Sequence, residues 1–212
     1  MGNLLEKYRT CFRDKKYRVS FFGALVFLLT ALVLAFFSII YANERASGPV
    51  TDIILSNIPV FDVDGLFVYG PIFFWAIIIF FLIFKEPKRI PFALESIATF
   101  EVIRSIFVML THIAPFPTHV SIDTSGIWGV FTSGSDLFFS GHTGLPFLIA
   151  LVFWDNKILR TISIAASVFF GIVVLLAHEH YSIDVFAAFF ITYTIFVIAK
   201  KLFRWDFETA SA

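Results

Sequence analysis

The feature that most constrains this sequence is a series of apolar runs, several of which approach the ~20 residues that a helix needs to cross a bilayer. Of the 212 residues, 58% are hydrophobic and 15% are charged, whereas about a quarter of a soluble domain is charged. The sequence therefore predicts an all-α integral membrane protein. Lys and Arg total 16 and Asp and Glu total 16, so nucleic acid is not an expected partner.

Six membrane spans are expected. They are Val19–Tyr41, Leu66–Phe84, Phe92–Leu110, Leu137–Trp154, Thr161–Ala177 and Ile183–Ala199. The first exceeds the ~7–15 apolar residues of a signal-peptide core, and we expect it to be retained. Without a repeat or linker, the chain divides into an N-terminal segment (1–18), a single six-span domain (19–199) and a tail (200–212).

The basic residues predict the orientation of these spans. Lys and Arg in short loops stay on the cytoplasmic side. Fourteen of the 16 lie in the N-terminal segment, in the loops after the second and fourth spans, and in the tail. This alternation predicts that both termini are cytoplasmic. All five histidines then lie on or near the outer face, which indicates a site there: His112, His119, His142, His178 and His180.

Two polar segments start the fourth and sixth spans at this outer face. The first is Asp136-Leu-Phe-Phe-Ser140-Gly141-His142-Thr143, and the second is His180-Tyr181-Ser182-Ile183-Asp184-Val185. His180 and Asp184 share a helical face if the helix begins early enough. A carboxylate on one imidazole nitrogen leaves the other free as a nucleophile. His142 is then the candidate general acid, because the pKa of histidine lies near neutrality.

The depth of these spans points to a phosphate at the lipid head groups. Both run from outside to inside, so their N-terminal N–H groups face the site and favour an anion. The helix from His142 to Trp154 is about 18 Å long, and the helix from Asp184 to Lys200 about 24 Å. Both fall short of the ~30 Å of hydrocarbon. The site is expected at or just below the outer interface, within reach of a lipid phosphate.

Further residues are candidates for substrate binding: Arg104, His112, Asp136, Ser140, Gly141 and Tyr181. An intramembrane charge such as Arg104 is a functional candidate by default, but a structural ion pair with Glu101 is the alternative. Asp136 is expected either to cap the fourth span or to orient His142. Ser182 is expected to be a helix N-cap.

His178 and Glu179 stand beside the candidate nucleophile. Either they have a role there or they face water. His119 is expected to be an ordinary loop residue.

The two segments resemble the third and fourth motifs of the sphingomyelin synthase family, Asp-x-x-x-Ser-Gly-His-Thr and His-Tyr-Thr-x-Asp-Val, with Ser182 in place of Thr. That family belongs to the lipid phosphate phosphatase superfamily, which includes the type 2 phosphatidic acid phosphatases. Two segments match the upstream motifs of the sphingomyelin synthase family more weakly: Pro49–Asp52, and Arg104 with Thr111–Pro117. The phosphatases' Ser-Arg-x5-His pattern is absent, because Val174 stands six residues before His180. The resemblance is therefore closer to the synthases.

The resemblance implies six spans, an outward-facing site and phospho-head-group transfer without a metal or cofactor. His180 would attack the phosphorus of a phospholipid, and His142 would protonate the departing diacylglycerol. The head group would then pass to a lipid alcohol such as ceramide or diacylglycerol. The alternatives are a lipid phosphate phosphatase that uses water as acceptor, and a non-catalytic lipid-binding or carrier protein. The short tails suggest a bacterial inner-membrane protein whose site faces the periplasm.

Overall fold

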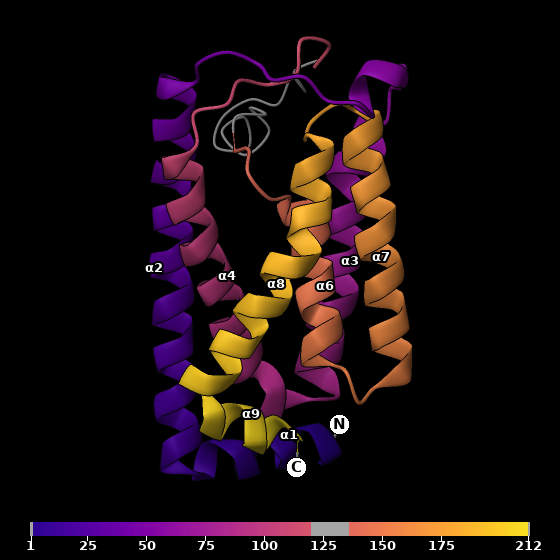
Figure 1. Ribbon diagram of the computed structural model, residues 1–212. Helices are drawn as coiled ribbons and strands as arrows, with labels where there is room; N and C mark the ends of the chain where they lie inside the picture. The colour runs from indigo at the N-terminus through magenta and orange to yellow at the C-terminus, as the bar shows by residue number, and fades with distance from the viewer. Residues whose placement is uncertain (1, 120–135, 212) are drawn as a thin grey trace.

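The computed structural model of the protein describes residues 2–119 and 136–211, and every regular element in these ranges is helical. The elements are α1 (Gly2–Arg13), α2 (Lys15–Arg45), η1 (Leu55–Asn57), α3 (Asp64–Phe84), η2 (Pro87–Arg89), α4 (Ile90–Leu110), α6 (Gly141–Val152), α7 (Lys157–Leu176), α8 (Ser182–Leu202) and α9 (Arg204–Ser211). The long helices form an elongated bundle, and the short helices α1 and α9 lie across one end of it (Figure 1).

The all-α membrane prediction is confirmed in its coarse form. Among the described residues, four helices are long and apolar enough to cross a membrane, namely α2, α3, α7 and α8. Helix α4 has 21 residues but carries Glu95, Glu101 and Arg104. Helix α6 has only 12 residues, or about 18 Å. The number of six spans and the orientation of the termini therefore stay predictions.

In three helices, α2, α6 and α7, a capping side chain rather than the end of the apolar run sets where the helix starts. The expected span Leu137–Trp154 was too long, because residues 136–140 are not helical and α6 begins at Gly141. Ser140 caps it by accepting from the N–H of Thr143. Asn156 likewise caps α7 through the N–H of Leu159. In α2 the cap is Asp14, which accepts from the N–H of Lys16.

Small residues let the helices approach closely. Four alanines on α2 are buried, and α2 packs along α4; small side chains at such contacts allow close backbone approach. Helix α6 packs against α7 and α8. A Cβ at Gly144 of α6 would lie 2.7 Å from Phe100 Cε2 and 2.8 Å from Thr192 Oγ1. Only glycine fits there, where α6 packs against α4 and α8.

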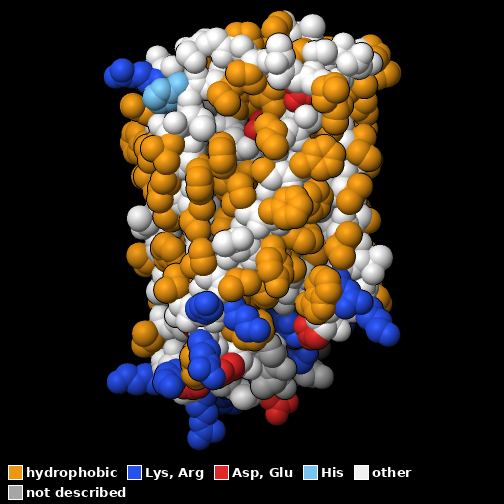
Figure 2. Space-filling model, viewed as in Figure 1, with side chains coloured by type: hydrophobic (Ala, Val, Ile, Leu, Met, Phe, Trp, Pro, Cys, Tyr) orange, Lys and Arg blue, Asp and Glu red, His pale blue; other side chains and the backbone are white. Residues whose placement is uncertain are grey.

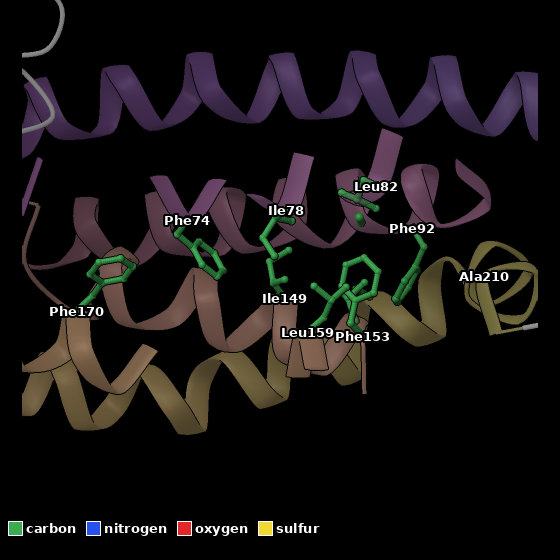
Figure 3. Packing of buried hydrophobic residues seen from close by; sticks show 12 residues of the cluster. Phe74, Ile78, Leu82, Phe92, Ile149, Phe153, Leu159, Phe170 and Ala210 are labelled. Carbon is green, nitrogen blue, oxygen red and sulfur yellow. The ribbon is translucent and has the colours of Figure 1, made fainter. Parts of the chain in front are cut away.

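Apolar side chains form much of the packed interior and much of the exterior. One cluster joins Phe74 and Ile78 of α3 to Ile149 of α6 and Phe170 of α7 (Figure 3). Apolar side chains also cover the middle of the visible outer face, while most of its Lys and Arg side chains gather at the end that carries α1 and α9 (Figure 2). A surface that is apolar in the middle and basic at one end is typical of a membrane helix bundle.

Candidate active site

Arg104 holds the non-helical segment that precedes α6. Its side chain is buried, and its Nη2 donates to Asp136 Oδ2 at 2.5 Å and to the Asp136 carbonyl at 3.0 Å. Its Nε donates to the Phe139 carbonyl at 3.2 Å. The hydroxyl of Thr111, at the end of α4, donates to the Leu137 carbonyl. The ion pair considered for Arg104 with Glu101 is therefore replaced by a pair with Asp136, which is 32 residues away in the sequence.

Asp136, the partner of Arg104, also interacts electrostatically with both candidate catalytic histidines. Burial raises the pKa of its carboxyl, but Arg104 and then His180 and His142 act in the opposite direction, and the pKa stays below its ordinary value. Asp136 is thus an ionised carboxylate within electrostatic reach of both imidazoles. Ser140 is the residue that caps α6, so Asp136 does not have the expected capping role; its side chain pairs with Arg104, and an orienting role toward His142 stays a prediction.

The second polar segment brings His180 and Asp184 together. His180 Nδ1 lies 3.4 Å from Asp184 Oδ2, and both side chains are buried. The same oxygen accepts from the N–H of Tyr181 at 3.1 Å. His180 precedes the helix, which begins at Ser182, so the N-terminal turn of α8 rather than a helical face makes this contact. Because the N–H of Ser140 donates to the Asp184 carbonyl at 3.1 Å, the two segments are directly joined.

His142 stands in the first turn of α6. Its ring stacks on Phe67 of α3, with 4.3 Å between ring centroids and 26° between ring planes. Nothing in the sequence distinguished Phe67 from the other apolar residues of its run. The neighbouring Gly141 lies over the guanidinium, since a Cβ there would sit 3.6 Å from Arg104 Nε. That distance is an ordinary contact, so the site does not require glycine at this position.

A cavity of about 190 Å³ adjoins this group. Glu101, Arg104, Asp136, Gly141 and His142 form its polar wall. Its apolar wall comes from α2, α3 and α6: Leu32, Ala35, Ile39, Trp75, Leu145 and Pro146. An arginine and a histidine thus face apolar helix surfaces across one small space. This arrangement suits a phosphate that remains attached to a lipid chain.

The N-terminus of α8 was expected to be open to an anion, but an aspartate side chain occupies it. The N–H of Ser182 donates to Asp52 Oδ2 at 2.7 Å. The other oxygen of Asp52 accepts from the N–H groups of Ile54 and Leu55 at 2.8 and 3.0 Å. Burial raises the pKa of Asp52, but these donors hold it below its ordinary value. In the sequence, Asp52 stood out only as part of Pro49–Asp52, the weak match to an upstream motif of the family.

Tyr181 is the N-cap residue of α8, so the expectation that Ser182 takes this position was wrong. The Tyr181 hydroxyl donates to the Ala114 carbonyl at 2.9 Å and accepts from the N–H of Val50 at 3.1 Å. Its side chain is buried. The contacts therefore show a residue that fixes two loops; they show no exposed group beside His180.

His112 lies apart from these segments. Its ring packs against Tyr41 of α2, with the centroids 5.7 Å apart, and its Nε2 lies 3.2 Å from the Met109 carbonyl. Its contacts are thus with α2 and the end of α4. The structure does not bring it to His142 or His180.

His178 and Glu179 are buried rather than facing water. The Thr118 hydroxyl lies 2.5 Å from His178 Nδ1, and His119 Nε2 lies 3.1 Å from Glu179 Oε2. His119 is therefore part of a partly buried polar pair, not an ordinary loop residue. Burial lowers the pKa of His178, which keeps its ring neutral near pH 7. These contacts hold residues 118–119 against the chain that leads into His180.

The segment that carries the two motifs has recognisable relatives. Residues 134–201 match the family described as PAP2 superfamily C-terminal. Over this segment the chain resembles the PAP2 superfamily. Together with the two relatives below, this match confirms the predicted resemblance.

Two curated relatives carry the resemblance. Sphingomyelin synthase-related protein 1 of Homo sapiens is 43% identical over 81 residues, which cover 35% of this chain and 19% of the relative. The protein of the same name from Mus musculus is 42% identical over 81 residues, covering 35% and 16%. The chain thus spans less than a fifth of the length of these relatives. No solved structure matches it.

Proposed function

We propose that this protein is a membrane lipid phosphotransferase like sphingomyelin synthase. It would transfer a phospho-alcohol head group from a phospholipid to a lipid alcohol of the ceramide or diacylglycerol type, through a phosphohistidine. The observation that carries the proposal is the hydrogen bond from Ser140 to the Asp184 carbonyl. It joins the His180–Asp184 pair to the start of the helix that bears His142, within the segment that matches the PAP2 family.

The first chemical step uses the free nitrogen of His180. Because Nδ1 faces Asp184, Nε2 is the nitrogen available to attack phosphorus. A P–N bond forms while the P–O bond to diacylglycerol breaks, and His142 donates its proton to the departing oxygen. The Asp184 carboxylate stabilises the positive charge that develops on the His180 ring.

The second step reverses these roles. His142 now takes the proton of the acceptor hydroxyl, the acceptor oxygen attacks phosphorus, and the P–N bond breaks. Arg104 lines the adjoining cavity and supplies a fixed positive charge for the phosphate oxygens. Asp136, paired with Arg104, keeps the guanidinium in place.

The proposal includes the six-span topology with both termini cytoplasmic. Basic residues of α1, η2, the first turn of α7 and the last turn of α8 lie at one end of the bundle (Figures 1 and 2), and the positive-inside rule assigns such an end to the cytoplasm. Helix α6, which carries His142 in its first turn, and helix α8, which His180 precedes, begin towards the other end. In a bacterial inner membrane that end faces the periplasm.

The second candidate is a lipid phosphate phosphatase, which the PAP2 match itself favours. The two functions differ only in whether a lipid alcohol or water takes the head group. We expect that reconstituted protein, given a phospholipid together with ceramide or diacylglycerol, will form a new lipid phosphodiester that mass spectrometry detects. Release of a free phospho-alcohol in the presence of these acceptors would favour the phosphatase. Absence of turnover with every lipid would contradict both and leave a non-catalytic lipid-binding protein.

A further inference from the structure

A second cavity lies at the opposite end of the bundle from His142 and His180. It has a volume of about 620 Å³ and is lined by α1, the α3–α4 connection (Lys85–Arg89), Asp155 and Ala210 of α9. We call it the basic cavity. Its volume lies within the range of small-ligand sites. The proposed phosphotransfer does not use it.

Its walls carry four cationic side chains and three carboxylates. Arg89 is 7% exposed and pairs with Asp155 through two hydrogen bonds, and its Nε lies 3.5 Å from Glu86 without a hydrogen bond. Within residues 2–119 and 136–211, no ion pair joins a carboxylate to Lys7, Lys85 or Lys88. One further carboxylate, Glu6, lines the cavity. Three lysine ammonium groups and one glutamate thus have no ion-pair partner among the described residues, so the unpaired charge of the cavity is positive.

The connection that carries two of these lysines is held in place. The hydroxyls of Tyr8 and Tyr17 donate to the carbonyls of Ile83 and Pro87 at 2.9 and 2.7 Å. Lys7 Nζ donates to the Lys85 carbonyl at 3.1 Å. These bonds tie α1 and the start of α2 to the connection, so the walls of the basic cavity are formed before any ligand arrives. A preformed site loses less conformational entropy on binding.

The surroundings of the basic cavity fit a lipid rather than a free anion. Helix α3 ends at Phe84, immediately before Lys85. Phe80, Ile83 and Phe84 are 57%, 39% and 44% exposed, so they offer an apolar surface just below the lysines. A lipid lying along this end of α3 would bring its phosphate to Lys85 and Lys88. We propose that the basic cavity binds the phosphate of an anionic phospholipid, as a site separate from the catalytic one.

The test compares full-length protein with a variant that lacks both lysines of the connection, Lys85→Gln/Lys88→Gln. Binding of dioctanoyl phosphatidylglycerol and dioctanoyl phosphatidylcholine is measured by native mass spectrometry from a neutral detergent. The matched control is Lys157→Gln/Lys201→Gln, which removes the same charge from exposed lysines that do not line the cavity. We expect the first variant to bind phosphatidylglycerol about tenfold more weakly or worse, and the control to bind as wild type does.

Two results would overturn this assignment. One is equal phosphatidylglycerol binding by the two double variants, which would show that the charge of this end, rather than the basic cavity, attracts the lipid. The other is binding of phosphatidylcholine, or displacement of phosphatidylglycerol by equimolar inorganic phosphate, at the affinity of phosphatidylglycerol itself. The measurement involves no turnover, so its failure and a failure of the proposed phosphotransfer are distinguishable.

Discussion

Helix α6 is held at both of its ends by a buried arginine that pairs with an aspartate. Arg104 binds Asp136 and the Phe139 carbonyl before the helix, and Arg89 binds Asp155 and the Val152 carbonyl after it. Both arginines are 7% exposed. We call these two arginine–aspartate pairs the clamps of α6. Each fixes one end of a helix that, with 12 residues, is shorter than the bundle around it.

The clamps differ in what surrounds the aspartate. The Asp155 side chain is 63% exposed, whereas that of Asp136 is 18% exposed and lies within electrostatic reach of His142 and His180. The pair of Arg89 and Asp155, whose carboxylate is exposed to water, is thus a structural anchor. We infer that the pair of Arg104 and Asp136 also serves the proposed chemistry, because two histidines lie near its carboxylate. The predictions below test this contrast.

The largest expected effect is at the histidine of the second segment. His180→Ala should lower the rate of head-group transfer by at least about 10³-fold, because it removes the proposed nucleophile. Lipid mass spectrometry of reconstituted protein measures the rate. His112→Ala is the control, since His112 contacts Tyr41 and Met109; it should stay within about twofold of wild type. Equal losses of transfer rate in the two variants would contradict the role of His180 as the nucleophile.

The two arginines should separate stability from turnover. Arg104→Gln leaves a buried carboxylate without its partner and should lower the free energy of unfolding by about 3–5 kcal/mol, together with turnover per folded molecule. Arg89→Gln should cost less, about 1.5–3 kcal/mol, because water reaches Asp155. Its turnover per folded molecule should match wild type. Denaturant unfolding in detergent and rates corrected for folded protein give both quantities; a dead but folded Arg89→Gln would contradict the contrast.

Between the clamps, two glycines of α6 should behave differently. Gly144→Ala forces a methyl group against Phe100 and Thr192 and should destabilise the protein by about 1–3 kcal/mol. Gly141→Ala meets only an ordinary contact with Arg104 and should leave the free energy of unfolding nearly unchanged. Unfolding midpoints of the two variants decide this. A larger loss for Gly141→Ala would mean that the first turn, rather than the middle of α6, is tightly packed.

The smallest expected effect is a difference between the two ends of the bundle in how the free energy of unfolding depends on pH. The pKa values of Asp52 and Asp136 are lowered in the folded protein. Their contribution to stability is therefore present above pH ~4 and is lost as the pH falls through the folded values. Burial raises the pKa of Asp206 in α9. Its contribution is present below pH ~4 and is lost as the pH rises through the folded value.

Asparagine variants test these opposite signs. Asp206→Asn should be at least as stable as wild type at pH 7, whereas Asp136→Asn should be less stable there. The free energies of unfolding at pH 7 and pH 4 provide the measurement. The same sign of change for both variants at pH 7 would show that the two ends do not differ in this respect.

Local patterns in the sequence predicted the parts of the site that depend on short spacings. His180 and Asp184 lie four residues apart, and the turn that starts α8 brings them together. Apolar runs likewise located the helices, because burial in lipid or protein requires uninterrupted apolar surface. The helix starts were misplaced, since polar caps such as Ser140 and Asn156 set them.

The contacts between distant segments could not be read in this way. Arg104 pairs across 32 residues with Asp136, and Asp52 reaches Ser182 across 130 residues. Both contacts depend on how helices and loops pack, which no local spacing encodes. Phe67 stacks on His142 from a third helix, and an apolar residue in an apolar run carries no sign of such a role.

The most direct test of the proposed chemistry is to trap the intermediate. Wild-type protein mixed with a phospholipid that carries ³²P in its head group should acquire a label that acid removes and base leaves in place, as a P–N bond requires. His180→Ala should acquire none, and Asp184→Asn should label more slowly because the imidazole loses its carboxylate partner. Undiminished labelling of His180→Ala would show that His180 is not the nucleophile and would contradict the proposed mechanism.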